Sequence, residues 1–211
     1  MRRVLAVTAL VFAVSLAGAD DLPFVLIPGM PSAPALDGTL ADPIWQQAAV
    51  LGAFVMLDGT AAPTQQTQVR LGHDAERLYL GVVCREDRLD RIQRSASARD
   101  GAVWSDDCIE VFIGGADPNT YYHLAFNSAG TVADEKCTGE GKDLGWKCDF
   151  RVTTGRREGA WTATASIPLQ QVGLEPGRPA RLNLCRSEVP HREASCWSAT
   201  LRGFHQPSRF G

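Results

Sequence analysis

One stretch of ten residues places an aromatic ring close to several carboxyl groups: Trp104-Ser105-Asp106-Asp107-Cys108-Ile109-Glu110-Val111-Phe112-Ile113. The apolar alternation is typical of a β-strand, in which successive side chains point to opposite faces. Trp104 and Glu110 then share one face, whereas Ile109, Val111 and Ile113 fill the other face and predict a core. Charged side chains are rare in strands and are seldom buried without a partner. The mixed face is therefore either a solvated sheet face or a ligand-binding face.

Catalysis by these acids is a poor fit to their spacing. Glycoside hydrolysis needs two carboxyl groups roughly 5–9.5 Å apart, but Asp106 and Glu110 are separated by about 13 Å along a strand at the usual rise per residue. The sequence contains no H-E-x-x-H, no G-x-S-x-G and no glycine-rich phosphate loop. We therefore expect a protein that is not an enzyme.

Saccharide binding suits the same residues better. A sugar ring presents C–H groups on one face and hydroxyl groups around its rim. Trp104 can supply an aromatic platform, a kind of contact worth about 0.5–1.5 kcal/mol beyond area burial. Glu110 can accept hydrogen bonds from neighbouring hydroxyl groups, and such charge-assisted bonds are strong.

The elements that must position these residues are mostly short strands separated by turn signals. Residues 20–35 are rich in proline and apolar side chains and predict an extended lead-in, and Pro43 to Ala49 predicts one short helix with Trp45 facing inward. Regular short strands without long helices between them favour an all-β fold, an antiparallel, jelly-roll-like β-sandwich. The expected strands are Ala53–Leu57, Gln68–Leu71, Leu78–Arg85, Cys108–Ile113, Tyr121–Asn127, Thr131–Asp134, Asp149–Thr154, Trp161–Ile167, Ala180–Arg186 and Cys196–Leu201.

The first 19 residues have the layout of a signal peptide: two arginines, an apolar run from Val4 to Leu16, and small residues before Asp20. We expect cleavage after Ala19 and an exported protein, secreted or periplasmic, without membrane insertion. Removing this segment takes away two of the 21 basic residues and none of the 24 acidic ones, so the formal charge becomes −5. Because the basic residues are scattered, we expect no nucleic-acid partner. We also expect the protein to be a monomer.

Six cysteines remain after export, and an oxidising compartment favours disulfides over metal ligation. A hairpin would bring Cys185 opposite Cys196. Cys137 and Cys148 bracket a glycine-rich loop that a disulfide could close. Cys84 and Cys108 remain as either a cross-strand disulfide or two buried thiols.

Three blocks of the chain resemble the family 9 carbohydrate-binding modules, which belong to the DOMON-like superfamily. They are Leu36 to Trp45, Trp104 to Ile113 and Phe204 to Gly211. The resemblance covers residues 36–211 and implies a β-sandwich that grips a saccharide, in some members a glycan chain end, between two aromatic rings. Such modules support polysaccharide catabolism and are often attached to glycoside hydrolases.

The resemblance also implies which residues contact the sugar. Trp104 matches one ring, Phe204 matches the second, and Glu110 matches the acid that binds hydroxyl groups. His123 and Asn127 complete the expected contacts, and Trp146 is a candidate for an extra one. No cofactor is required, although some relatives hold structural calcium, for which the candidate donors here are Asp74, Asp87, Asp106 and Asp107.

Two other functions stay open. A basic residue of the family falls near His123 or Ala125, where this chain has no arginine, and Phe204 is smaller than the usual tryptophan. These differences are consistent with a structural or partner-binding sandwich whose sugar site has decayed. A haem-binding redox domain would need axial ligands, and Met56 with His123 or His205 are the candidates.

Overall fold

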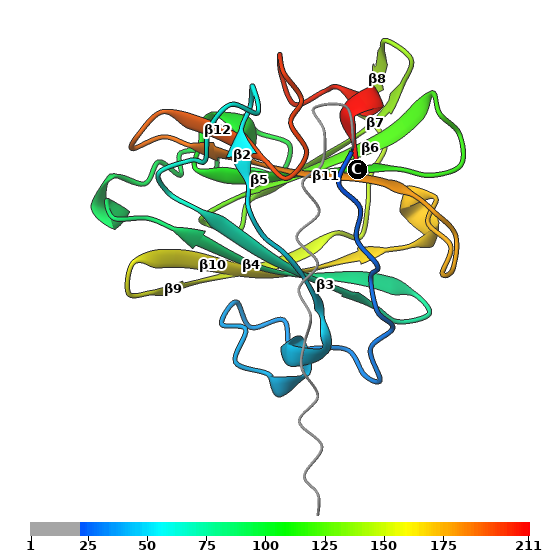
Figure 1. Ribbon diagram of the computed structural model, residues 1–211, viewed down its shortest axis with the longest axis horizontal. Coiled ribbons are helices and arrows are strands. Elements are labelled where there is room, and N and C mark those ends of the chain that lie inside the picture. Colours follow the sequence, from blue (N-terminus) through cyan, green and yellow to red (C-terminus); the bar gives the residue numbers. More distant parts are fainter. Residues whose placement is uncertain (1–21) are drawn as a thin grey trace, which may run out of the picture.

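Alternating apolar residues along the central strands build two antiparallel sheets that pack face to face in the computed structural model, which describes residues 22–211 (Figure 1). The expected signal peptide over residues 1–19 lies outside the described residues. The predicted all-β sandwich is confirmed. Sheet A has the order β1-β3-β4-β10-β9, with β1 Ala49–Leu51, β3 Thr67–His73, β4 Arg77–Arg85, β10 Ala160–Pro168 and β9 Arg151–Arg157. Sheet B has the order β2-β12-β11-β5-β6-β7-β8, with β2 Val55–Met56, β12 Glu193–Cys196, β11 Arg181–Glu188, β5 Cys108–Gly114, β6 Thr120–Asn127, β7 Val132–Thr138 and β8 Gly141–Asp143.

The main core lies between the two sheets. Strand β5 contributes Ile109, Val111 and Ile113 to this core, as its alternation predicts, and all three are essentially inaccessible to solvent. Trp161 on β10 is also fully buried there. The inner face of β5 is thereby fixed, and its other side chains, Glu110 among them, must lie on the outer face of sheet B.

Each sheet carries a cover on its outer face. The N-terminal segment folds under sheet A in Figure 1, where Trp45 is buried against Met30 and Tyr79. The C-terminal segment, red in Figure 1, lies over sheet B, and its Phe210 is buried with Phe112. The outer face of sheet B is therefore enclosed by chain from the far end of the sequence.

Several predicted elements differ from the structure. The expected N-terminal helix is a single 3-10 turn, η1 (Pro43–Gln47), and the other 3-10 turns are η2 (Leu89–Arg91), η3 (Val103–Ser105), η4 (Gln170–Val172) and η5 (Pro207–Arg209). The strand predicted over Cys196–Leu201 is wrong, because β12 ends at Cys196 and the chain then turns toward its C-terminal segment. Strand β8 has no counterpart in the sequence prediction.

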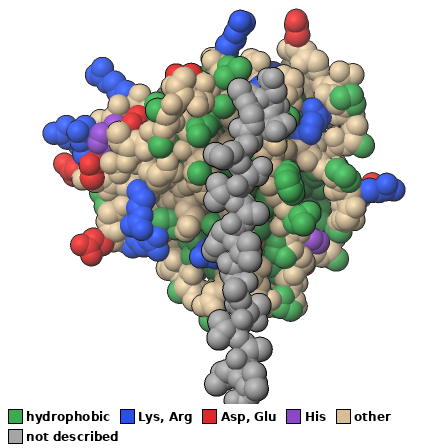
Figure 2. Space-filling view, in the orientation of Figure 1, with side chains coloured by type: hydrophobic (Ala, Val, Ile, Leu, Met, Phe, Trp, Pro, Cys, Tyr) green, Lys and Arg blue, Asp and Glu red, His purple; other side chains and the backbone are tan. Residues whose placement is uncertain are grey.

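The described part of the chain has no helix long and apolar enough to cross a membrane. On the face shown in Figure 2, positive and negative side chains are scattered, without an extended patch of one sign.

Candidate functional site

The outer face of sheet B carries most of the residues that the sequence singles out. Glu110 on β5 lies in register with Ala125 on β6 and with Cys185 on β11. Toward the start of β5, Cys108 packs with Val103 and Ala125. Toward its end, Phe112 packs with residues of the C-terminal segment. Glu110 therefore lies between two apolar clusters on a floor of small side chains.

A chain of charged contacts crosses this face. His123 Nε2 lies 2.7 Å from Glu110 Oε2, and His123 Nδ1 lies 3.0 Å from Glu135 Oε1. Lys142 Nζ donates to the same oxygen of Glu135 at 2.7 Å. The imidazole ring of His123 stacks on Phe112 with centroids 4.5 Å apart and an interplanar angle of 4°. His123 is thus held from both sides and from one face, so its orientation is fixed.

His205, from the C-terminal segment, meets this group edge-on. Its ring centroid lies 4.7 Å from that of His123, at an interplanar angle of 80°. The Tyr121 hydroxyl group lies 2.9 Å from His205 Nδ1. Tyr121 and His123 alternate with the inward-facing Tyr122 on β6, so strand geometry brings the first two together.

The two histidines have opposite electrostatic environments. Burial lowers the pKa of His123, but hydrogen bonds with Glu110 and Glu135 outweigh burial and leave that pKa above its usual value. The hydrogen bond between His123 and Glu135 lowers the pKa of Glu135 to about 2. Burial opposes this shift, and Lys142 adds to it. Burial and the nearby charge of His123 lower the pKa of His205 to about 4. The two carboxylates therefore favour the protonated form of His123, whereas His205 is neutral at neutral pH.

Trp104 does not lie on the strand that the sequence predicts. It belongs to η3, and β5 begins only at Cys108, so the inference that Trp104 and Glu110 share a strand face is wrong. Its side chain is nonetheless 53% exposed beside that strand, since η3 packs against both β5 and β6. Trp104 is therefore an exposed residue on the turn that precedes β5.

The acids after Trp104 hold the loop that precedes it. Asp106 accepts hydrogen bonds from the backbone N–H groups of Ser95 and Ala96, at 2.8 and 2.9 Å, and from Asn127 Nδ2 at 2.8 Å. Asp107 accepts from the backbone N–H of Gln93 at 2.7 Å. These carboxylates are buried but satisfied, which explains why a strand-like sequence carries them.

Asn127 lies on the same outer face as Glu110, opposite Cys108, whereas Trp146 lies on the core side of the sheet. Asn127 is fully buried, and its amide group donates to Asp106 and to the Ala96 carbonyl oxygen. Trp146 packs on Tyr122, with ring centroids 4.9 Å apart, on the core side of sheet B. Phe204 is partly buried against the cluster that contains Phe112, on the other side of Glu110 from η3.

The expected calcium donors are distributed over the molecule. Asp74 accepts from the Tyr79 hydroxyl group and from backbone N–H groups in the turn after β3. Asp87 lies 3.1 Å from His191 Nε2 and is largely exposed. Asp106 and Asp107 are engaged by the loop described above. The four carboxylates therefore do not form one ligand set.

The predicted disulfides Cys137–Cys148 and Cys185–Cys196 are corrected by the structure, in which all six cysteines are buried free thiols. For Cys84 and Cys108 the structure shows the second alternative, two buried thiols. Cys137 lies in the cluster on the outer face of sheet B, whereas Cys148 lies in the core between the sheets. The sheet itself separates these two residues.

Cys84 and Cys108 are separated in the same way, because Cys84 is in the main core and Cys108 is on the outer face of sheet B. Cys185 and Cys196 do lie opposite each other in register. They remain thiols, and a hydrogen bond from Cys185, against the effect of burial, lowers the pKa of Cys196.

The haem alternative does not fit this geometry. Met56 is on β2, and four strand steps separate β2 from β6, which carries His123. At about 4.8 Å per step, this separation is roughly 19 Å, far too wide for two ligands of one iron. His205 also contacts β6, through Tyr121, so it offers Met56 no closer partner.

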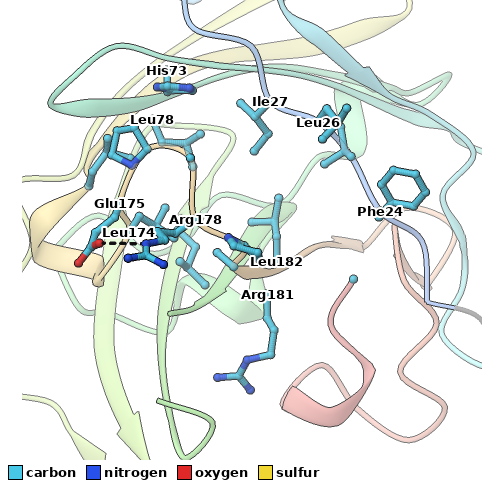
Figure 3. Close-up of a pocket in the computed structure, with 18 of the residues that line it drawn as sticks. Phe24, Leu26, Ile27, His73, Leu78, Leu174, Glu175, Arg178, Arg181 and Leu182 are labelled. Carbon is cyan, nitrogen blue, oxygen red and sulfur yellow. Dashed lines mark ion pairs between the residues drawn. The ribbon is translucent and has the colours of Figure 1, made fainter. Parts of the chain in front are cut away.

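A cavity lies elsewhere, at one end of the sandwich (Figure 3). It measures about 470 Å³ and is enclosed by the lead-in around Leu26, by Leu78 and Leu182 from the two sheets, and by the loop around Leu174. Arg181 turns away from it and donates to the carbonyl oxygens of Asp117, Pro118 and Thr120. An apolar lining of this kind does not suit a hydroxyl-rich ligand.

Two functional candidates were missed or misassigned from the sequence. Glu135 was not singled out, although the alternation of β7 puts it on the face of Cys137. His205 was considered only as a haem ligand. Its position depends on the fold of the C-terminal segment, for which the sequence has no local signal.

Comparison with known proteins agrees with this architecture. A crystal structure from Bacteroides uniformis ATCC 8492, described as a candidate carbohydrate-binding protein, superposes with a TM-score of 0.70 at 19% identity, covering 88% of this chain and 95% of the other. Two structures of a family 9 carbohydrate-binding module from Caldicellulosiruptor kristjanssonii, in complex with cellotriose and with glucose, each give a TM-score of 0.60 at 18% identity. They cover 88% of this chain and, respectively, 90% and 92% of theirs.

No curated protein matches the chain. The model of one family, however, matches residues 36–211, which is most of the sequence and includes all three blocks identified above. The chain belongs to the carbohydrate family 9 binding domain-like family.

Proposed function

We propose that this protein binds a saccharide on the outer face of sheet B, without catalysis. The observation that carries the proposal is the state of Glu110. Its Oε2 lies 2.7 Å from His123 Nε2, whereas its Oε1 makes no hydrogen bond with a side chain of residues 22–211. A buried carboxylate with one free acceptor is suited to orient a hydroxyl group. The exposed Trp104 belongs to η3, which precedes the strand that carries Glu110.

In this proposal Trp104 is the stacking platform, Phe204 is the opposing apolar wall, and His123 fixes the orientation of Glu110. Trp104 belongs to η3, before the start of β5, whereas Phe204 packs against the cluster that contains Phe112, near the end of β5. The solved relatives bound to cellotriose and glucose support β-linked glucose oligosaccharides as the first ligands to test.

Calorimetric titration with glucose, cellobiose and cellotriose tests the proposal. We expect Trp104→Ala to weaken binding by roughly tenfold or more, because the platform contributes about 0.5–1.5 kcal/mol beyond the area that it buries. Glu110→Gln keeps the shape of the side chain and should also weaken binding. Leu144→Ala is a matched control, since Leu144 is an exposed apolar residue on the loop after β8, and it should bind as the wild type does.

Equal affinity in the wild type and Trp104→Ala would refute the assigned site. A titration of borohydride-reduced cellotriose tests for recognition of the reducing chain end, because reduction opens only the ring at that end. Loss of binding on reduction is the result expected for a site that binds the reducing end.

A structural or partner-binding role is the second candidate, and one observation favours it. Glu110 is only 4% exposed and is paired with His123, where the family resemblance leads one to expect a basic sugar-binding residue. Absence of measurable affinity for any saccharide, in a protein with a cooperative unfolding transition, would support this second role.

Export is proposed on the N-terminal sequence alone. We expect a mature, monomeric protein that begins at Asp20 and acts outside the cytoplasm in polysaccharide breakdown. Mass spectrometry of the protein isolated from its host tests this directly, and retention of residues 1–19 would contradict it.

A further inference from the structure

Glu110, His123 and His205 also form a cluster with the chemistry of a metal site. Each residue offers one ligand atom, and these three atoms all lie within 4.8 Å of one another. The residues come from β5, β6 and the C-terminal segment, so the fold, and not one sequence motif, brings them together. Two imidazoles and one carboxylate are the protein ligands of open zinc sites, in which water takes the fourth position.

The spacing requires only small movements to close around an ion. Bonds of about 2.0–2.2 Å in a tetrahedral site place neighbouring ligand atoms about 3.3 Å apart. His123 Nε2 and Glu110 Oε2 are at 2.7 Å, so they would separate slightly. The nitrogen of His205 would approach by no more than about 1.5 Å, a distance that rotation of a partly exposed side chain can supply.

The groups behind both imidazoles are already in place. Glu135 lies at hydrogen-bond distance from His123 Nδ1, and the Tyr121 hydroxyl group lies at the same kind of distance from His205 Nδ1. In metal sites the second ring nitrogen of a ligating histidine is almost always held by a carboxylate or another polar group, which fixes the tautomer and the ring orientation. Both Nε2 atoms are therefore the nitrogens left for an ion.

Electrostatics agrees with this arrangement. Glu110 and Glu135 supply the negative charge that compensates a divalent cation. His123 must release its Nε2 proton when the ion binds, and Lys142, whose side chain is about half exposed, can move away from Glu135.

We propose that Glu110, His123 and His205 bind a divalent transition-metal ion of the zinc class, with one position left for water or a hydroxyl group. Two imidazole ligands favour such an ion over calcium, which prefers six to eight oxygen ligands. The inference does not rest on the proposed sugar binding, since metal binding is measurable without any saccharide.

A second cluster, Glu86, Asp107 and Glu188, carries no such proposal. Its carboxylates accept hydrogen bonds from backbone N–H groups and from Arg186, so their oxygens are already engaged. Glu86, Asp87 and His191 form another group with similar spacing. Replacement of His191 therefore serves as a control for replacement of His205.

The full chain is first reduced and freed of metals with a chelator. It is then titrated with cobalt, and zinc binding is measured by calorimetry. We expect one equivalent of Co²⁺ to produce visible d–d absorption, and zinc to displace it. His205→Ala should abolish this binding, and because His205 is partly exposed the variant should fold. His123→Gln should do the same, with folding verified by thermal unfolding. His191→Ala should bind as the wild type does.

Three outcomes would overturn the assignment. They are the absence of stoichiometric binding, loss of binding in His191→Ala but not in His205→Ala, and a strong near-ultraviolet thiolate-to-cobalt band. The last would place the ion on Cys137, which lies close to His205 and Glu135. Sugar titrations in the presence of a chelator test the two proposals separately. If the protein binds sugar through Trp104 but binds no metal, only the metal proposal is refuted.

Discussion

Replacing Asp106 by alanine tests how the loop that carries Trp104 is held. Asp106 is 1% exposed and accepts three hydrogen bonds, two from backbone N–H groups and one from Asn127. A bond to a charged group contributes about 1.5–3 kcal/mol, so the three together set an upper limit of roughly 4.5–9 kcal/mol. Ser95 is exposed, and water can replace part of this loss. We therefore expect Asp106→Ala to lower the free energy of unfolding by about 2–4 kcal/mol.

The assay is urea unfolding followed by tryptophan fluorescence at pH 7, with Asp58→Ala as the matched control. Asp58 also accepts two hydrogen bonds, both from Thr60, but it does so at the surface. Asp58→Ala should therefore lower the free energy of unfolding much less than Asp106→Ala does. A loss below about 1 kcal/mol for Asp106→Ala, or one no larger than that of Asp58→Ala, would contradict the reasoning, because such a loss is that of a single ordinary hydrogen bond.

The dependence on pH gives this prediction a second readout. Burial raises the pKa of Asp106, but hydrogen bonds from Ser95, Asn127 and Ala96 outweigh it and leave the pKa below its usual value. The carboxylate therefore stabilises the fold at every pH above the unfolded-state pKa. This contribution is lost as the pH falls through the lower folded-state pKa. The difference between wild type and Asp106→Ala should be constant from pH 7 to pH 5 and should shrink in strong acid.

Two further predictions concern the backbone and a buried acid. Gly38 has φ +78°, and a Cβ atom there would lie 2.6 Å from the carbonyl carbon of Thr154, so Gly38→Ala should destabilise the fold well beyond the effect of Gly159→Ala, where φ is +65° and no atom is within 4 Å. Equal losses in thermal unfolding would contradict the steric argument. Burial, with help from Glu188, raises the pKa of Glu86 to about 7, so its contribution to stability is present below about pH 4.5 and is lost as the pH rises through 7. Glu86→Gln should therefore reduce the decline of the melting temperature between pH 5 and pH 8, and an unchanged slope would exclude Glu86 as its source.

Strand faces could be predicted from the sequence because they depend on a local period of two. The alternation of Ile109, Val111 and Ile113 placed Glu110 on the opposite face, and the structure confirms this placement. The same rule places Tyr121 and Tyr122 on opposite faces of β6, as observed. The hairpin that aligns Cys185 with Cys196 was likewise predictable, since a short polar connection joins their strands.

Features that depend on contacts distant in sequence could not be predicted. The residues from Trp104 to Asp107 continue the pattern of a strand, but Asp106 and Asp107 bind backbone N–H groups at positions 93, 95 and 96 and form a turn instead. Bracketing a loop did not bring Cys137 and Cys148 together, because the chain crosses from the outer face of sheet B to the core between them. No local pattern encodes either contact.

Glu110 is the residue in which the predictable and the unpredictable parts of the site meet. The position of Glu110 on its strand follows from alternation. That His205 lies near Glu110 follows only from the path of the C-terminal segment. The two oxygens of Glu110 have different environments: Oε2 lies beside His123, and Oε1 makes no hydrogen bond with a side chain of residues 22–211. Substitutions at the edges of the site can therefore separate the two proposed activities: Trp104→Ala removes only the sugar platform, whereas His205→Ala removes only a metal ligand. Glu110→Gln should impair both, because each ligand requires the carboxylate itself.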